Sequence, residues 1–253
     1  MKIKAAGIKV GDSVEFDENN VYSVKERKSF FPRINVANIE CVVIVVAALP
    51  EPDFLLVDKL IVEARYCGAE VILAVNKTDL GAEICDYVQN NYLKAADALY
   101  FLSAETGEGV EDLKAAIRGK FAAFAGQSAV GKTSLINRIF NKEERVNELS
   151  EKTLRGRHTT TARTIHIEGD FMITDTPGFS SSQEFSVESF DLPLYYKEFE
   201  PYNGKCYYIG CSHIAEPDCL VKEALSRGDI SEDRYKRYVV IYKEIKEYEK
   251  RKY

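Results

Sequence analysis

The sequence has no apolar run long enough to cross a membrane. The longest stretch, CVVIVVAAL at residues 41–49, is less than half of the about 20 residues that a spanning helix needs, so it predicts a buried strand. The first residues, MKIKAAGIKVGD, contain no apolar core of signal length. We therefore expect no export signal, no membrane partner and a cytoplasmic, reducing location.

The sequence also lacks an excess of positive charge, internal repeats and low-complexity segments. Its net charge of −6 argues against a protein that coats nucleic acid with its whole surface, although local basic patches are compatible with it. The 253 residues, 45% hydrophobic and 29% charged, are typical of a globular protein with one large core and one or two small appendages.

Three regions differ in patterning, and we predict domains over residues 1–34, 35–190 and 191–253. The first contains short alternating segments separated by turns, GIKVGDSVEF and VYSVKERKSF, which predict a small β-lobe or a fragment of a barrel. The second alternates apolar strands with amphipathic helices, which predicts an α/β domain with a mostly parallel sheet covered on both faces. The third is rich in tyrosine and cysteine and ends in two predicted helices.

The periodicity places these elements along the chain. The predicted strands of the central domain are 41–49, 71–77, 98–104, 120–128, 162–169 and 170–178. The predicted helices are 53–68, 82–96, 110–119, 133–140, 218–228 and 231–253, and Ser231 is the expected N-cap of the last one.

The segment GQSAVGKT, residues 126–133, matches the phosphate-loop pattern G-x-x-x-x-G-K-[ST] between a predicted strand and a predicted helix. Backbone N–H groups of such a loop suit a β-phosphate, Lys132 would reach the β- and γ-oxygens, and the Thr133 hydroxyl would bind Mg²⁺. By itself the pattern also fits a chance glycine-rich turn. A second motif, DTPG, begins at Asp175 at a predicted strand end, where it would hold Mg²⁺ and present the Gly178 amide to a γ-phosphate.

The tetrad NKTD, which ends the strand VILAVNK, predicts guanine recognition. The carboxylate of Asp79 can accept from two adjacent N–H donors of guanine, which adenine lacks. Asn76 would brace neighbouring loops, the Lys77 stem would lie along the base, and the segment SAETGEG from Ser103 would offer a backbone amide to the guanine oxygen.

Four motifs at four strand ends make a chance match improbable, so the sequence predicts GTP binding. The residues predicted to bind the nucleotide are Asn76, Lys77, Asp79, Ser103, Ala104, Gly126, Gln127, Ser128, Ala129, Val130, Gly131, Lys132, Thr133, Ser134, Asp175 and Gly178.

The order of the motifs is unusual, because the guanine motif precedes the phosphate loop. Ligands of such sheets bind beyond the carboxyl ends of the strands, whatever the chain order, so we infer a circular permutation. The chain after DTPG then leads directly into the C-terminal region, which would couple a γ-phosphate sensor to that region.

The segment LRGRHTTTART, residues 154–164, has the position and polarity of a first switch. One of Thr159 to Thr161, for which we favour Thr160, would complete the Mg²⁺ shell. Phe179 stands where many GTPases place a water-orienting glutamine, and an aromatic ring cannot orient water, so slow intrinsic turnover is expected. His158 is then a candidate catalytic group beside Lys132 and Thr160, or else a residue that contacts phosphate or RNA.

Three of the six cysteines cluster near the C-terminus in KCYYIGCSHIAEPDC. Cys206, Cys211, His213 and Cys219 form a ligand set for a closed, structural Zn²⁺ site, with packed thiols as the alternative. The other cysteines, Cys41, Cys67 and Cys85, are expected to be small buried hydrophobic residues.

The permuted guanine motifs, GRHTTT, DTPGF and the C-x4-C-x-H-x5-C cluster together resemble the ribosome small-subunit-dependent GTPase A family, RsgA or YjeQ. The resemblance implies an N-terminal OB-fold, a permuted GTPase domain and a zinc-bearing helical domain. It also implies a monomeric Mg²⁺-dependent GTPase that is stimulated by the small (30S) ribosomal subunit in late maturation and contacts its rRNA. The N-terminal lobe is shorter than a complete OB-fold, and Ala129 replaces the usual glycine.

Basic stretches with interleaved aromatics, in KERKSFFPR, EKTLRGRH and the last helix, suit contacts with RNA. Other functions remain open at this stage. These are a GTP-gated RNA-binding switch with negligible hydrolysis, a permuted GTPase of the large subunit and, more distantly, a zinc hydrolase.

Overall fold

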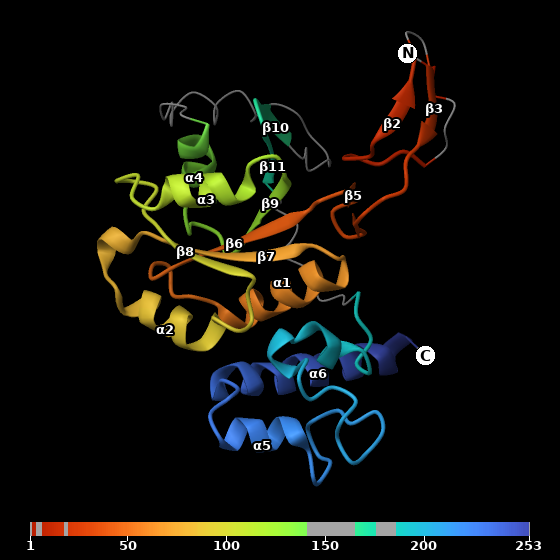
Figure 1. The fold of residues 1–253 in the computed structure, drawn as a ribbon, viewed down its shortest axis with the longest axis vertical. Coiled ribbons are helices and arrows are strands. Elements are labelled where there is room, and N and C mark those ends of the chain that lie inside the picture. The colour runs from red at the N-terminus through yellow and green to blue at the C-terminus, as the bar shows by residue number, and fades with distance from the viewer. Residues whose placement is uncertain (1, 4–6, 18–19, 141–164, 176–185, 253) are drawn as a thin grey trace.

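The computed structural model describes residues 2–3, 7–17, 20–140, 165–175 and 186–252 of the chain. A mixed sheet with helices on both faces forms the centre, a β-lobe projects from one side, and a helical lobe packs against one helical layer (Figure 1). In these ranges, no helix combines the length and the apolarity that a membrane span requires.

The amino-terminal lobe is an open set of short strands, which agrees with the expected partial barrel. Its strands are β1 (Lys2–Ile3), β2 (Val14–Phe16), β3 (Asn20–Val24), β4 (Phe30–Phe31) and β5 (Val36–Ala37). The first three form one sheet in the order β1-β3-β2, and β4 pairs with β5. This second pair spans the predicted domain boundary at residue 34, which stays a prediction, as does the boundary at residue 190.

The central sheet has the strand order β10-β11-β9-β6-β7-β8. Five of its strands are mutually parallel: β6 (Cys41–Ala47), β7 (Glu70–Asn76), β8 (Ala98–Phe101), β9 (Phe121–Ala125) and β11 (Phe171–Asp175). The edge strand β10 (Ile165–Glu168) runs antiparallel to β11. The carboxyl ends of β6, β7, β8, β9 and β11 therefore meet along one edge of the sheet, as the sequence predicted.

Helices cover both faces of this sheet. The helices α1 (Phe54–Tyr66) and α2 (Glu83–Tyr92) pack on one face, and α3 (Val110–Ile117) and α4 (Lys132–Ile139) pack on the other (Figure 1). Every residue of β6 is buried, because alternate side chains enter two separate cores. This explains why the strand is a continuous apolar run rather than an alternating one.

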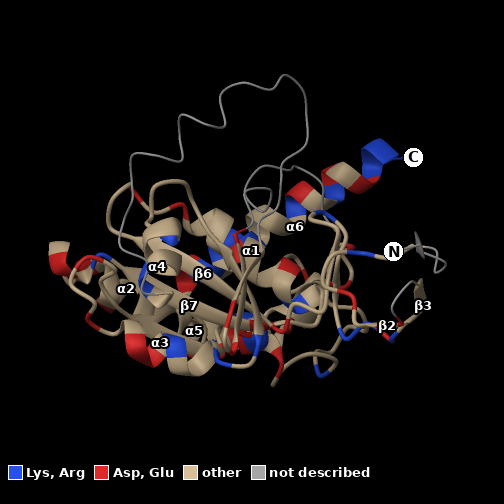
Figure 2. Cartoon of the chain, turned by 90° about the horizontal axis from the view of Figure 1, so that it is seen from above, with Lys and Arg blue, Asp and Glu red and all other residues tan. Residues whose placement is uncertain are grey.

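The carboxy-terminal lobe consists of short helical turns and two helices. These elements are η2 (Leu192–Tyr195), η3 (Lys197–Phe199), α5 (Leu220–Ser226) and α6 (Glu232–Lys252), and a further short turn, η1 (Thr78–Leu80), follows β7 in the central domain. Ser231 caps α6 as predicted, since its hydroxyl accepts the N–H of Arg234 at 3.2 Å. The last turn of α6 carries Lys250, Arg251 and Lys252, the basic end visible in Figure 2.

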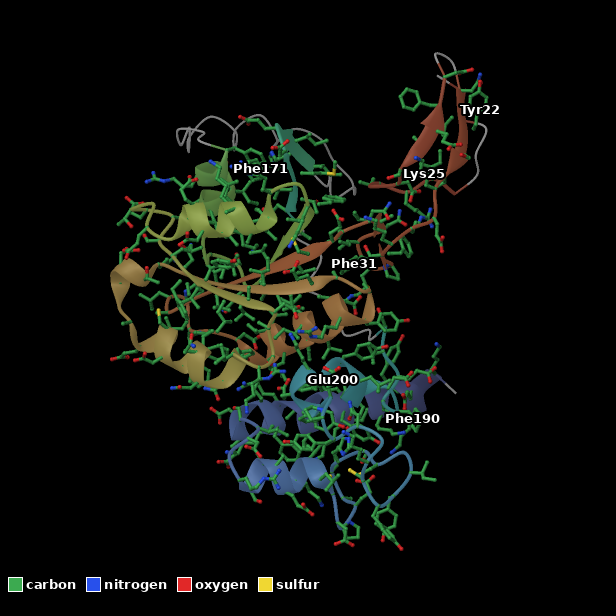
Figure 3. The ribbon with its side chains drawn as sticks, viewed as in Figure 1. Tyr22, Lys25, Phe31, Phe171, Phe190 and Glu200 are labelled. Carbon is green, nitrogen blue, oxygen red and sulfur yellow. The ribbon has the colours of Figure 1, made fainter. Side chains whose placement is uncertain are left out.

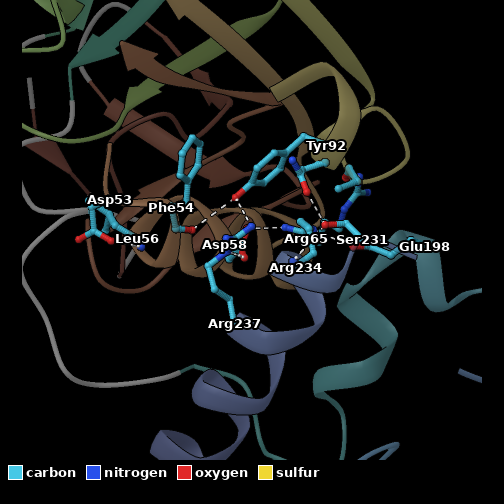
Figure 4. A network of polar contacts seen from close by, with 12 residues as sticks. Asp53, Phe54, Leu56, Asp58, Arg65, Tyr92, Glu198, Ser231, Arg234 and Arg237 are labelled. Carbon is cyan, nitrogen blue, oxygen red and sulfur yellow. Dashed lines mark hydrogen bonds and ion pairs between the residues drawn. The ribbon is translucent and has the colours of Figure 1, made fainter. Parts of the chain in front are cut away.

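A buried ion cluster joins this lobe to the central domain. Asp58 of α1 accepts from Arg234 of α6, and both side chains are almost fully inaccessible to solvent. Arg234 also donates through Nε to Glu198 of η3 at 2.7 Å, while Arg237 donates to the second oxygen of Asp58 at 2.6 Å (Figure 4). The cluster draws its members from three elements that lie far apart in the sequence.

Aromatic rings complete the surroundings of this cluster. The guanidinium carbon of Arg234 lies 4.9 Å from the ring centroids of both Tyr92 and Tyr196, and such contacts favour a desolvated cation. The fully buried Tyr92 and Tyr196 rings also exclude water from the ion pair. Removal of one charge would leave its partner buried and uncompensated, which costs far more than the loss of an exposed pair.

We expect Asp58→Asn to lower the free energy of unfolding by about 3–5 kcal/mol, because Arg237 then has no carboxylate partner and the two guanidinium groups are compensated by Glu198 alone. Urea denaturation measures this change. The control is Glu244→Gln, which removes a more exposed ion pair between the same two helices, Lys59–Glu244, and should cost no more than about 1 kcal/mol. Equal losses in the two variants would show that the cluster has no special role.

Candidate functional site

Three loops and the last residue of a fourth strand meet at the carboxyl edge of the sheet. NKTD follows β7, SAETGEG follows β8, the phosphate loop follows β9, and DTPG begins at the end of β11. Asp175 is in register with Phe124 on the neighbouring strand, so it lies beside the start of the phosphate loop. The topology therefore brings the predicted nucleotide-binding residues within the described ranges, which are all but Gly178, to one edge.

Asn76 ties three of these loops together. The side chain is 1% exposed, and its Nδ2 donates to the carbonyl of Val130 in the phosphate loop at 2.9 Å. Its Oδ1 accepts the N–H of Ala104 at 3.0 Å. A Cβ at Gly131 would lie 2.3 Å from Asn76 Nδ2, and Gly131 has a φ of +95°, so glycine is required there. These contacts match the bracing role predicted for Asn76.

Ser103 orients the carboxylate of Asp79. Its buried hydroxyl donates to Asp79 Oδ1 at 2.5 Å and also accepts the N–H of Thr106 at 3.1 Å. The sequence assigned a backbone contact to this loop and missed the side-chain role of the serine. Among the backbone amides of this loop, one of which is predicted to contact the guanine oxygen, that of Ala104 is paired with Asn76.

Lys77 connects the guanine motif to two further loops. It has a left-handed φ of 63°, and its Nζ donates to the carbonyls of Leu49 at 2.8 Å and Ala129 at 2.9 Å. These two carbonyls thus hold the ammonium group, and the aliphatic stem of the side chain spans the distance between the loops. This placement is compatible with the predicted packing of the stem along a base.

The phosphate loop has the backbone conformation of an anion-binding turn. Gly126 has a φ of +131°, and a Cβ there would lie 2.3 Å from the carbonyl oxygen of Val45. Ala129 has a φ of 64°, a left-handed conformation that costs a residue with a Cβ about 1–2 kcal/mol. Glycine would adopt the same conformation without this strain.

Lys132 lies inside the phosphate loop. Its Nζ donates to the carbonyls of Gly126 at 2.9 Å and Gln127 at 2.8 Å. Burial lowers the pKa of this ammonium group, and the negative charge of Asp175 opposes the shift. A partly desolvated cation of this kind gains strongly from an anion, which is what phosphate oxygens would supply.

The remaining loop residues fit the same site. Gln127 accepts the N–H of Asp53 at 3.1 Å, Ser128 and Thr133 are exposed, and Ser134 is half-buried at the start of α4. The Thr133 hydroxyl and the Asp175 carboxylate are hard oxygen donors of the kind that Mg²⁺ prefers.

Four residues that the sequence singled out lie outside the described residues: His158, Thr160, Gly178 and Phe179.

The four residues of the cysteine cluster come together in the C-terminal lobe. The ligand atoms of Cys206, Cys211, His213 and Cys219 all lie within 4.8 Å of one another. His213 Nδ1 is 3.6 Å from Cys206 Sγ and 3.4 Å from Cys219 Sγ. A tetrahedral Zn²⁺ site requires about 3.6 Å between such nitrogen and sulfur donors. The geometry therefore fits zinc.

The protonation chemistry of the cluster also suits a metal. Asn203 Oδ1 accepts from His213 Nε2 at 3.3 Å, which leaves the Nδ1 lone pair facing the thiols. Burial lowers the pKa of His213, with Glu216 opposing this shift, and so favours the neutral ligand form. Burial raises the pKa of the Cys211 thiol to about 12, a cost that a bound dication would offset. With four protein donors, a metal ion held there would be structural rather than hydrolytic.

Helix α6 packs against this cluster. The hydroxyl of Tyr235 donates to the carbonyl of His213 at 2.7 Å, and that of Tyr238 donates to the carbonyl of Ser212 at 2.5 Å. Outside the cluster, Cys41 and Cys67 are buried and Cys85 is half-buried, as expected for packed thiols.

The structure limits which residues of the predicted RNA surface are accessible. Arg234 and Arg237 of the last helix pair with the buried Asp58 and so cannot contact phosphate. In KERKSFFPR, Phe31 is buried and Arg27 is paired with Asp12 at 2.7 Å, whereas Lys28 is largely exposed. The segment EKTLRGRH lies outside the described residues.

Comparison with known proteins decides the family. A model described as RsgA GTPase matches residues 20–185, well over half of the chain. The chain belongs to the RsgA GTPase family. Its fold, a circularly permuted GTPase domain flanked by a β-lobe and a helical lobe, is confirmed by the solved structures that it resembles, and it is a GTP-hydrolysing enzyme.

Individual relatives support this assignment. A protein of Ruminiclostridium cellulolyticum named small ribosomal subunit biogenesis GTPase RsgA is 38% identical over 231 residues, which cover 90% of this chain and 76% of the relative. A protein of the same name from Thermotoga maritima is 38% identical over 249 residues, with 94% and 84% covered. The crystal structure of YjeQ from Thermotoga maritima superimposes with a TM-score of 0.83 at 32% identity, covering 96% of this chain and 88% of that one. The structure of YloQ, titled a circularly permuted GTPase, gives 0.77 at 25% identity, with 96% and 83% covered.

We expect Asp79→Asn to weaken binding of guanine nucleotides at least about tenfold, because the amide replaces one charged acceptor with a donor. Xanthine nucleotides carry a carbonyl in place of the amino group. Their affinity for Asp79→Asn should fall much less than that of guanine nucleotides, or rise above their affinity for the wild type. Titration with fluorescent nucleotides measures both, and Asp112→Asn on the exposed side of α3 is the control. Unchanged guanine selectivity in Asp79→Asn would contradict the assignment.

The cysteine cluster predicts one zinc ion per chain. Cys211→Ser should reduce the zinc content measured by mass spectrometry from about one to near zero, and it should loosen the packing of the lobe seen by near-ultraviolet circular dichroism of its tyrosines. Cys85→Ser, on α2, should leave both unchanged. Full zinc content in Cys211→Ser would rule out the four-ligand site.

Proposed function

We propose that this chain hydrolyses GTP with Mg²⁺ and that it does so on the small ribosomal subunit during the late steps of that subunit's maturation. The observation that supports this most is the Asn76 brace, which holds the guanine loops and the phosphate loop in one rigid arrangement. The names of the relatives supply the subunit and the process. The compartment in which this work is done is the cytoplasm, and the active form is a monomer.

In the proposed site, each residue has a separate task. Asp79, held by Ser103, accepts the two N–H groups of guanine and so rejects adenine, since a bound base that lacks those donors would cover the carboxylate and leave it unpaired. The phosphate-loop amides receive the β-phosphate at the N-terminus of α4. Lys132 exchanges its bonds with the loop carbonyls for bonds with phosphate oxygens.

Thr133 and Asp175 would hold Mg²⁺, which neutralises the charge that develops on the phosphates. Thr160 would complete the shell, the Gly178 amide would contact the γ-phosphate, and His158 would position the attacking water in place of the glutamine that Phe179 replaces. Zn²⁺ on the cysteine cluster would keep the C-terminal lobe folded.

Contact with rRNA is proposed for the projecting β-lobe. Tyr22 is 54% exposed on β3 and the exposed Lys25 follows the same strand, so the outer hairpin carries an accessible ring and an accessible cation (Figure 3). Aromatic rings stack on unpaired bases, and lysine neutralises phosphate. Phe16 of β2 is also exposed, and because it pairs with Val21 rather than Tyr22 it offers a ring on the other face of the hairpin.

Turnover assays with separated ribosomal subunits test the proposal. We expect purified small subunits to raise the GTP hydrolysis rate by at least about tenfold and large subunits to have no effect. If neither subunit stimulates hydrolysis, the result would favour a GTP-gated RNA-binding switch, which is the alternative that Phe179 suggests. Stimulation by the large subunit alone would favour action on that subunit.

A further inference from the structure

The C-terminal lobe exposes several large apolar side chains beside the cysteine cluster. Each is at least 43% exposed, and Ile209 is fully exposed. Scattered exposed apolar residues are normal, whereas a contiguous group of them marks an interaction surface. We call this group the apolar knob, and its members are Phe190, Leu194, Tyr207, Tyr208 and Ile209, of which Phe190 is labelled in Figure 3.

Two segments of the chain meet in the apolar knob. The ring of Phe190 covers Gly210, since its Cε2 lies 3.0 Å from the position that a Cβ of Gly210 would take. The rings of Tyr207 and Tyr208 pack edge to face, with centroids 5.1 Å apart. Leu194 belongs to the turn η2, one turn beyond Phe190. The knob is therefore one surface and not a set of separate side chains.

The cysteine cluster holds the loop 207–210 in place. The loop lies between Cys206 and Cys211, two of the four candidate zinc ligands, so both of its ends are fixed when the metal site forms. Beyond it, Glu216 accepts the backbone N–H of Ser212 at 2.9 Å. A preorganised loop loses little conformational entropy on binding, so more of its contact energy contributes to affinity.

The charge around the apolar knob indicates the class of its partner. Residues 186–219 contain six acidic side chains and two lysines. Both lysines are engaged, Lys197 in an ion pair at 2.8 Å and Lys205 in a hydrogen bond to a backbone carbonyl at 2.8 Å. Such a surface repels phosphate and attracts basic groups. The exposed acidic side chains of this segment are Glu188, Glu200 and Asp218.

Ile209 also favours a protein over RNA. A tyrosine ring can stack on an unpaired base, but isoleucine has neither a flat ring nor a hydrogen-bonding group with which to read one. Its exposed surface is removed from water most effectively in an apolar pocket. The basic last turn of α6, whose Glu249 holds Ser189, is a nearby feature that suits RNA. The test must therefore separate the two classes of partner.

We propose that the apolar knob docks into an apolar pocket, rimmed by lysine or arginine, on a protein of the small ribosomal subunit. The proposal rests on the proposed function for the location of the partner. The chemistry of the pocket follows from the knob itself. This contact is separate from the rRNA contact proposed for the β-lobe, on which Tyr22 is exposed.

Photo-crosslinking from the knob tests the class of partner. The full-length, zinc-loaded protein carries p-benzoylphenylalanine in place of Ile209 and is bound to purified small subunits with a non-hydrolysable GTP analogue. We expect a crosslink to a subunit protein, identified by mass spectrometry, in a product that survives ribonuclease. The same probe in place of Tyr22 is the contrast, and its product should be sensitive to ribonuclease.

The crosslinking result can contradict the proposal in several ways. A crosslink from position 209 to rRNA or to a second copy of the chain overturns it, and so does the absence of a crosslink in protein that is bound to the subunit. If the wild type does not bind small subunits at all, the proposed function fails together with this inference, so the two failures are distinguishable.

Affinity measurements show whether the knob contributes to binding. Ile209→Ser should raise the Kd for small subunits at least about tenfold, while the zinc content and the hydrolysis rate without subunits stay unchanged. Phe190→Ser should have the same effect, and because it lies outside the loop 207–210 it keeps the test valid if Ile209→Ser loses zinc. Leu93→Ser, at a 59% exposed site after α2, is the control and should bind like wild type. Wild-type affinity in zinc-loaded Ile209→Ser and Phe190→Ser contradicts the proposal.

Discussion

The buried ion pair between Asp58 and Arg234 is the interaction on which the arrangement of this molecule depends. Asp58 lies on α1, which is packed against the sheet through apolar residues, so the charge is fixed relative to the nucleotide edge. Arg234 and Arg237 then fix α6, and Glu198 fixes the turn η3. Each charge is compensated only when all these elements are assembled. The C-terminal lobe is therefore fixed against the GTPase domain by a buried interface and is not joined to it only through a flexible linker.

Helix α1 extends this connection to the nucleotide loops. At its N-terminus, the backbone of Asp53 donates to the phosphate-loop residue Gln127, and near its other end Glu63 accepts from Ser186. One helix therefore contacts the phosphate loop, the zinc lobe and the chain beyond DTPG. Circular permutation makes this possible, since it places the γ-phosphate motif immediately before the C-terminal lobe. Through these contacts of α1, the GTPase domain and the C-terminal lobe form one connected structure.

Most of the fold could be predicted from the sequence, because its signals are local. The apolar run 41–49 and the periodic pattern of 53–68 correspond to β6 and α1, with ends shifted by one or two residues. The ion cluster could not be predicted, because Arg234 and Arg237 lie in a helix whose polar pattern is that of a solvated surface. Burial of a charge depends on a partner far away in the sequence, and a single sequence carries no local sign of it.

The candidate site likewise has features that could be predicted from the sequence and features that could not. The spacing of NKTD and GQSAVGKT was sufficient to place Asn76, Asp79 and Lys132 at one edge, since parallel strands share that edge. The hydroxyl of Ser103 on Asp79 and the pairing of the Ala104 amide depend on side-chain geometry that no motif encodes.

Calorimetry of the zinc-loaded protein tests most directly whether the two lobes form one unit. The buried cluster predicts a single unfolding transition, whose midpoint rises with GDP and falls when zinc is chelated. Two separate transitions, one responding only to nucleotide and the other only to zinc, would contradict the account.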